Sequence, residues 1–346
     1  MGFASPYLGD VNVQVSQLLF SASYLIGVKA SKTYKELSQK QSDLSKVDVV
    51  SNVTKAYYGV IINEYRLELM EYSLEQLDSL YNQTKVLYEV GLAEEIDFQQ
   101  VEVNYNNLLN EKRTLERLIV LNMAQLKFQM GMKLDEEISL SDKIDDEFLA
   151  ELDTSKVESD FSDRIEFDIL NTNITLQELS LRNYKSQYLP TFSAFGNFGF
   201  NTGASSLGGT FSNSWLSYSL VGLNLSIPVF DGLRKSALIQ QTKLEIEKLE
   251  NQKSLLLKQM SLELTQANVS FYGSLDRYKS QKDNLELAKS VYESTIKKQR
   301  IGVSSTQEVL DIRTLYKETE TNYYTALYDL LISKVDREKA LGVLVK

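Results

Sequence analysis

Hydrophobic residues recur at alternating spacings of three and four along most of the chain, which is the pattern of a coiled-coil helix. Helix breakers are rare, because the only prolines are Pro6, Pro190 and Pro228. Residues 233–301 contain one glycine and no proline, so one helix of about 100 Å is possible there. Residues 21–90 have the same character, with glycine only at 27 and 59. The pattern therefore predicts helices far longer than those of ordinary globular domains.

The apolar positions of the second half repeat those of the first at an offset of 211 residues. The glycines follow the same offset, since Gly91 corresponds to Gly302 and Gly131 to Gly342. Residue identity across the repeat is low, so the shared spacing is what predicts an internal duplication with a left-handed supercoil. The corresponding positions are Val309, Ile312, Tyr316, Thr319, Tyr323, Ala326 and Leu330 against Phe98, Val101, Tyr105, Leu108, Lys112, Leu115 and Ile119.

Three shorter segments alternate between apolar and polar residues, which predicts strands with two different faces. They are 11–16, 191–201 and 221–229, and Phe195 is the one large apolar residue on a polar face. A glycine- and serine-rich stretch at 202–214 predicts a loop between the second and third strands. Alternation suits a membrane β-barrel and a sandwich equally well. Because two or three strands cannot form a stable sheet alone, we expect strands from several subunits to close a barrel.

Composition removes several classes of function. The formal net charge is −10, which argues against a nucleic-acid partner. The chain has no cysteine and no histidine, so disulfides, thiolates, imidazole bases and most transition-metal sites are absent. The sequence contains no GxSxG, P-loop or GxGxxG motif of an enzyme. We therefore expect no enzymatic activity, no cofactor and no metal site.

An ordered set of motifs resembles the TolC-like outer-membrane efflux protein family, also called outer membrane factors. The motifs are "QYLPTFSAF", "LSIPVFDGLRKSALI", a long helix, and "IGVSSTQEVLD" followed by "KALGVL". The resemblance covers nearly the whole chain and implies a mainly α fold with a membrane β part. Long coiled-coil hairpins would form a trimeric α-barrel joined to a shared β-barrel. The expected segments are a barrel strand (1–20), a first long hairpin (21–130), an equatorial segment (131–163), an ascending helix (164–189), a strand pair (190–230) and a second long hairpin (231–346).

The resemblance also implies a function and a set of partners. The family's proteins are passive exit ducts of tripartite efflux or type I secretion systems, in the outer membrane and extending into the periplasm of Gram-negative bacteria. The expected partners are two further copies of the chain, a periplasmic adaptor (membrane fusion) protein, an inner-membrane transporter and outer-membrane lipid. Compared with the family pattern, we expect the chain to lack an N-terminal helix and the first strand, which we interpret as truncation. The sequence does not distinguish drug, metal and protein export.

Candidate site residues follow from the same resemblance. Glu308 and Asp311 lie three residues apart on one helix face, where the family has an acidic constriction near the periplasmic mouth. Asp97 takes the matching place in the first repeat. Rings of carboxylates there would form a cation-attracting channel gate, although a solvated helix face would show the same residues.

The two glycine turns are the second candidate site. Gly91 with Leu92 and Gly302 with Val303 would form the tips that dock the adaptor, although a turn without any binding role is the simpler alternative. The contrasting hypothesis for the whole chain is a structural coiled-coil scaffold or fibre protein without channel activity. That hypothesis accounts for the heptads and the charge, but gives no reason for the alternating strands.

Overall fold

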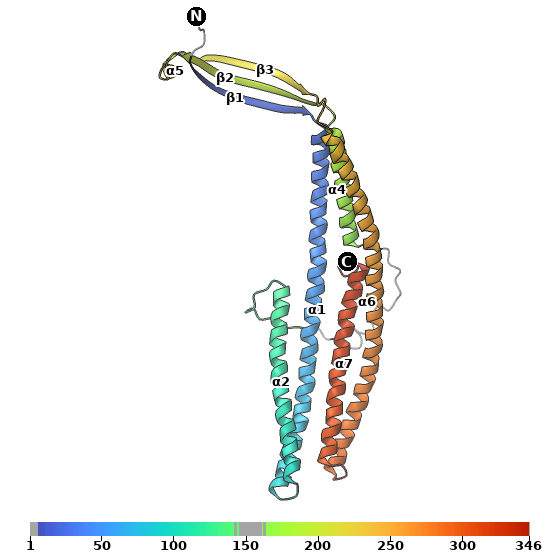
Figure 1. Ribbon diagram of the computed structural model, residues 1–346. Coiled ribbons are helices and arrows are strands. Elements are labelled where there is room, and N and C mark those ends of the chain that lie inside the picture. Colours follow the sequence, from blue (N-terminus) through green and yellow to red (C-terminus); the bar gives the residue numbers. More distant parts are fainter. Residues whose placement is uncertain (1–5, 142–143, 145–160, 162–163, 346) are drawn as a thin grey trace. The chain divides into compact units, whose positions relative to one another are not determined.

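The computed structural model describes residues 6–141, 144, 161 and 164–345. Of the expected equatorial segment, residues 142–143, 145–160 and 162–163 lie outside the described part. No described helix is both long enough and apolar enough to cross a membrane. The elements, labelled in Figure 1, are β1 (Tyr7–Phe20), α1 (Ala22–Glu89), α2 (Glu95–Gln129), α4 (Ile165–Ser186), β2 (Thr191–Ala204), α5 (Gly209–Ser212), β3 (Leu216–Ser226), α6 (Arg234–Arg300) and α7 (Thr306–Leu341).

The chain divides into two compact units, and each combines segments that are far apart in the sequence. The first unit consists of residues 1–41 and 166–255, and the second of residues 42–165 and 256–346. The long helices α1 and α6 each contribute to both units. The sheet therefore lies in the first unit, and the turns at Gly91 and Gly302 lie in the second.

The sheet is antiparallel with strand order β1–β2–β3. Its register pairs Asp10 with Asn201 and Asn12 with Gly199, and Gly199 in turn pairs with Tyr218. Paired residues share a face, so polar side chains gather on one side and Val11, Val13 and Val15 lie on the other with Phe198 and Phe200. The predicted two-faced strands are therefore confirmed.

Phe195 breaks the alternation for a reason that the sheet register explains. Its cross-strand partner is Gly222, and a methyl group added at Gly222 would come within 2.7 Å of the Phe195 ring. The ring therefore covers the surface that a glycine leaves open in a strand. This cross-strand pair lets one aromatic residue occupy an otherwise polar face.

The first unit also holds the junctions between the sheet and the helices. The ammonium group of Lys235 is buried at the start of α6, where it donates to the carbonyl of Gln187 at 3.3 Å and lies 4.6 Å from the Tyr188 ring centroid. The backbone N–H of Lys235 donates to the Asp231 carboxylate at 3.0 Å. These contacts fix the end of α4 to the start of α6.

The second unit is built from two helical hairpins with equivalent packing. In the first hairpin the rings of Tyr81 and Tyr105 stack with centroids 5.3 Å apart. In the second, Tyr292 and Tyr316 stack at 5.4 Å, and both residues lie 211 positions further along the chain. The duplication predicted from spacing is thus present in the side-chain packing.

Buried seam residues hold each hairpin together, as the heptad pattern predicts. Lys112 is the one charged seam residue, and its ammonium forms an ion pair of 2.8 Å with Glu71 of α1. The hydrogen bond to Glu71 raises the pKa of Lys112. The first-hairpin cluster is formed by Met70, Leu77, Val101, Leu108 and Leu115 together with Leu310 of α7, and the second-hairpin cluster by Ala288, Tyr292, Val309 and Tyr316.

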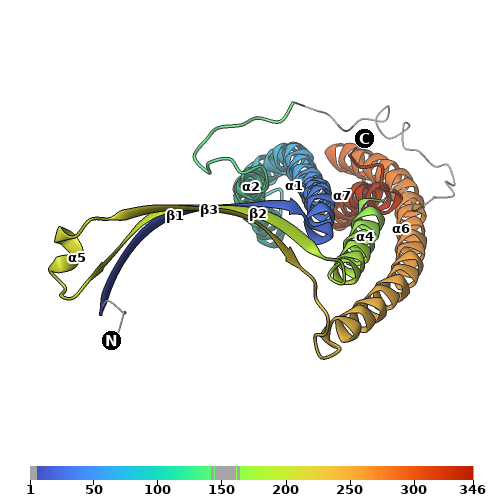
Figure 2. The same cartoon turned by 90° about the horizontal axis from the view of Figure 1, so that it is seen from above.

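A third cluster joins the hairpins further from the turns. It brings Tyr58 and Ile62 of α1 together with Phe271 of α6 and Leu327 and Leu330 of α7. Viewed from above, α7 lies beside both α1 and α6 (Figure 2). Ile144 also packs on this cluster, and its backbone N–H donates to the Tyr65 hydroxyl at 2.8 Å.

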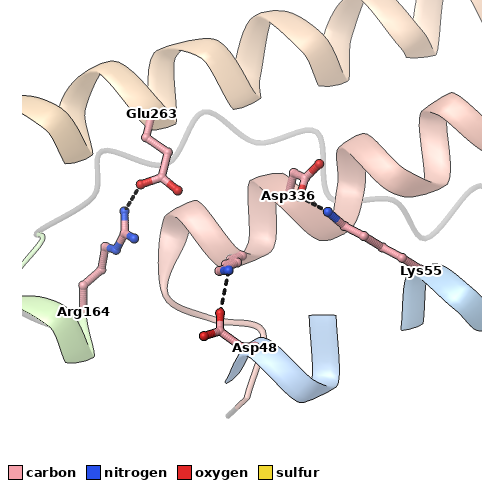
Figure 3. A network of polar contacts seen from close by, with 6 residues as sticks. Asp48, Lys55, Arg164, Glu263 and Asp336 are labelled. Atoms are coloured by element: carbon pink, nitrogen blue, oxygen red, sulfur yellow. Dashed lines mark hydrogen bonds and ion pairs between the residues drawn. The ribbon is translucent and has the colours of Figure 1, made fainter. Parts of the chain in front are cut away.

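Ion pairs surround the end of α7 (Figure 3). The Arg164 guanidinium is buried and lies 2.7 Å from the Glu263 carboxylate of α6. Lys55 of α1 pairs with Asp336 of α7, and Lys339 of α7 pairs with Asp48 of α1 at 2.8 Å. Two of these pairs link α7 to α1, and the third links Arg164 to α6.

Candidate functional site: the helical tips

Both turns between helices are closed by the same backbone hydrogen bonds. Gly91 and Gly302 have φ angles of 75° and 77°, in the left-handed region that glycine adopts without strain. The N–H of Leu92 donates to the Leu87 carbonyl at 2.8 Å, and the N–H of Val303 donates to the Lys298 carbonyl at 2.9 Å. Each turn is therefore a Schellman motif, which satisfies carbonyl groups at the helix end.

The helices that follow the two turns begin differently. Ser305 caps α7, because its hydroxyl accepts a hydrogen bond from the backbone N–H of Glu308 at 3.1 Å. The Glu308 carboxylate accepts from the Ser304 hydroxyl at 2.7 Å. At the corresponding position Glu94 begins α2 without a side-chain cap. The second tip is thus the more strongly organised of the two.

The apolar side chains at the two turns are exposed. Leu92 is 77% exposed and Val303 is 71% exposed, and Ile301 is exposed beside the second turn. Large apolar side chains at a loop tip gain nothing for the fold of the chain that carries them. They are typical of a surface that packs against another molecule.

The three predicted gate carboxylates lie at the beginnings of the ascending helices. Glu308 and Asp311 are exposed in the first two turns of α7, and the Asp311 carboxylate accepts from the Gln307 amide at 2.7 Å. Asp97 is half-buried in the first turn of α2. None of the hydrogen bonds found among the described residues joins Asp97 to Glu308 or Asp311.

A polar group that the sequence analysis missed lies further from the turns, where three helices meet. We call it the α7 polar cluster: Arg313, Lys317 and Glu320 of α7, Arg66 of α1 and Glu111 of α2, which line one cavity. Arg313 is only 7% exposed, and Lys317 pairs with Glu111. Burial raises the pKa of Glu320 to about 7, and the negative charge of Glu111 adds to the rise. The one signal in the sequence is that Arg313 and Glu320 directly follow the seam positions Ile312 and Thr319.

Comparison with known proteins supports the resemblance to outer-membrane efflux proteins. The model of the family described as outer membrane efflux protein matches residues 180–343. The chain is similar to TolC-like outer membrane efflux proteins. Such proteins are placed in the outer membrane, so the predicted location is confirmed.

Relatives match over almost all of the length of this chain. Outer membrane protein TolC of Vibrio cholerae is 21% identical over 97% of this chain and 77% of its own. Among solved structures, the CmeC outer membrane channel of Campylobacter jejuni has a TM-score of 0.73 at 16% identity, covering 97% of this chain and 78% of that one. The MtrE outer membrane channel of Neisseria gonorrhoeae has a TM-score of 0.76 at 14% identity, covering 99% and 81%. The fold of these channels is therefore the fold of this chain.

Proposed function

We propose that the chain forms a trimeric channel that serves as the passive exit duct of a tripartite efflux or type I secretion system. The membrane part would be a β-barrel closed by strands from the three copies, and the helical hairpins would line the duct in the periplasm. Residues 131–163 would form an equatorial belt. The observation that carries the proposal is the pairing of a two-faced sheet with duplicated hairpins in an outer membrane efflux protein.

Two exposed apolar stripes support assembly from several copies. Leu118, Leu121 and Phe128 form one stripe on α2, and Leu262 and Val269 form another on α6. Both stripes have coiled-coil spacings, and both lie between about 27 and 40 residues from their tip glycines. The two stripes therefore lie at similar distances from the tips. If α2 of one copy packs on α6 of the next, the same contact repeated closes a ring.

The tips would dock a periplasmic adaptor, and an inner-membrane transporter would supply the energy through it. Exposure of Leu92 and Val303 supports docking, because each side chain can insert between residues of a partner. Glu308, Asp311 and Asp97 would act as the channel gate, each forming a ring of three carboxylates that attracts cations. In this proposal the duct binds no cofactor, metal or nucleic acid and catalyses no reaction.

The test is assembly and conduction by the detergent-purified protein. We expect a heat-modifiable trimer that partitions into detergent and conducts ions in planar lipid bilayers. A coiled-coil scaffold, the contrasting hypothesis, would stay soluble without detergent and give no current. Either of those two results from a correctly folded protein would refute the duct.

Stripe variants test the assembly itself. Leu262→Asp with Val269→Asp would place two charges in the α2–α6 contact, and we expect loss of the trimer with little loss of helix content. The matched control is Ser280→Asp with Asn284→Asp, two exposed positions on the same helix. A trimer that survives the first pair of substitutions would remove the stripes from the interface.

A further inference from the structure

The cavity of the α7 polar cluster is lined by more positive than negative charge. The cations are Arg66, Arg313 and Lys317, and the carboxylates are Glu111 and Glu320. Lys317 and Glu111 form an ion pair with each other, so their charges cancel. The two guanidinium groups are then left with the single carboxylate of Glu320. The lining therefore carries a net positive charge even when Glu320 is ionised.

Neither guanidinium is paired directly with a carboxylate. Arg313 is buried, and it forms no hydrogen bond and no ion pair with any residue that the structure describes. The Arg66 guanidinium donates to the neutral side-chain oxygen of Asn63 at 3.3 Å. A buried cation without a partner is unfavourable, because it has lost its water and gained no hydrogen bond. The Arg313 guanidinium therefore favours an occupant of the cavity that accepts hydrogen bonds.

The size of the cavity limits what this occupant can be. Its volume of about 20 Å³ is enough for one occupant of the size of a water molecule. Phosphate, sulfate and organic anions contain several heavy atoms and are too large. Chloride is a single atom only a little larger than water, and it accepts hydrogen bonds from several donors at once. The hydroxyl groups of Ser73 and Tyr316 line the same cavity and supply further donors.

We propose that this cavity is a chloride-binding site, in which one anion is shared by the guanidinium groups of Arg66 and Arg313. The ion would join two hairpins, since Arg66 belongs to α1 and Arg313 to α7. Water fits the same volume, but it is neutral and leaves two like charges facing each other across the cavity. The site lies within one chain, so it does not depend on the proposed duct.

Chloride NMR on the detergent-purified protein tests the site. The resonance of free chloride is narrow, and it broadens when the ion exchanges with a protein site on which it tumbles slowly. Chloride is titrated while sodium gluconate keeps the ionic strength constant, because gluconate is too large for the cavity. We expect a broadening that saturates as chloride is added.

Three variants separate the cavity from a general attraction of anions. Arg313→Met removes the buried guanidinium but keeps a long side chain, and we expect chloride affinity to fall about tenfold or more. Glu111→Gln releases Lys317 from its ion pair, so chloride affinity should rise about tenfold or more. Arg113→Met removes the same charge from an exposed position of α2, and chloride affinity should stay unchanged.

Chloride should also stabilise the contact that it bridges. Amide hydrogen exchange around Arg313 should slow when gluconate is replaced by chloride at the same ionic strength. Chloride at about ten times its Kd should make opening of this contact about tenfold rarer. We expect no slowing in Arg313→Met. Circular dichroism confirms that this variant is folded, and an apolar residue in place of a buried unpaired cation also removes a desolvation cost.

An unbroadened chloride resonance in the folded, unaltered chain would overturn the site, and so would a saturable broadening that persists in Arg313→Met. Equal loss in Arg113→Met would assign the broadening to surface charge and would overturn the site as well. The readout needs no conduction. Saturable chloride binding in a protein that carries no current keeps the site and refutes the duct, whereas a conducting trimer without such binding does the opposite.

Discussion

Replacing Gly302 with alanine isolates the cost of the left-handed turn. The residue has a φ of 77°, and a methyl group built there meets no atom within 4 Å. Steric clash therefore contributes nothing, and the whole cost is that of holding an L-residue in the left-handed region, about 1–2 kcal/mol. The turn should open about 5- to 30-fold more often.

Gly273 provides the matched control with the opposite sign. It lies in the interior of α6, it is exposed, and a methyl group there also meets no atom within 4 Å. Alanine is about 1 kcal/mol more favourable than glycine inside a helix. Gly273→Ala should therefore make local opening of α6 about fivefold rarer. The same glycine-to-alanine substitution is therefore expected to destabilise the turn at residue 302 and to stabilise the helix at residue 273.

Amide hydrogen exchange, followed by mass spectrometry on the detergent-purified protein, measures both effects locally. In Gly302→Ala, exchange should speed up at the turn, where the Val303 N–H is bonded to the Lys298 carbonyl. In Gly273→Ala, exchange should slow around that residue. Unchanged exchange at the turn of Gly302→Ala would refute the assignment of a strained left-handed position, and faster exchange in Gly273→Ala would refute the reasoning on helix propensity.

Three further predictions concern the proposed channel gate, the core and pH. Replacing Glu308 and Asp311 together with alanine should raise single-channel conductance and weaken cation preference; unchanged currents would remove both residues from the constriction. Leu330→Ala should cost about 2–5 kcal/mol in thermal or denaturant unfolding, because Leu330 is 0% exposed, and a loss below 1 kcal/mol would contradict the seam packing. The free energy of unfolding should fall as pH rises from about 4.5 to 7, since Glu320 binds its proton more tightly in the folded state. Glu320→Gln should remove the contribution of Glu320 to this pH dependence.

The elements that depend on local pattern could be predicted from the sequence. Heptad spacing identified the seam that buries Val101 and Leu330, and the two tip glycines identified the turns. Alternation identified the faces of the three strands. Each of these features is set by the residues within a few positions, which is the range that periodicity reports.

Features that depend on a third element could not be predicted in this way. Phe195 breaks the alternation of its strand, and only the strand register, which pairs it with Gly222, explains why. The α7 polar cluster forms only where α1, α2 and α7 lie side by side. A heptad pattern shows which face of a helix is buried, but it does not identify the helix that packs against that face. Arg313 and Glu320 therefore resembled ordinary charges beside a seam.

The matched lengths of the repeated helices restrict which insertions and deletions the chain can accommodate. α2 and α7 have 35 and 36 residues, and each turns at a glycine whose place is fixed relative to the stacked tyrosines. Deleting one residue from α7 would rotate everything beyond it by about 100° and bring Leu330 to the surface. Insertions and deletions within the hairpins of natural variants should therefore span multiples of seven residues, and the facing helix should change by the same number. Other insertions and deletions should lie outside the hairpins.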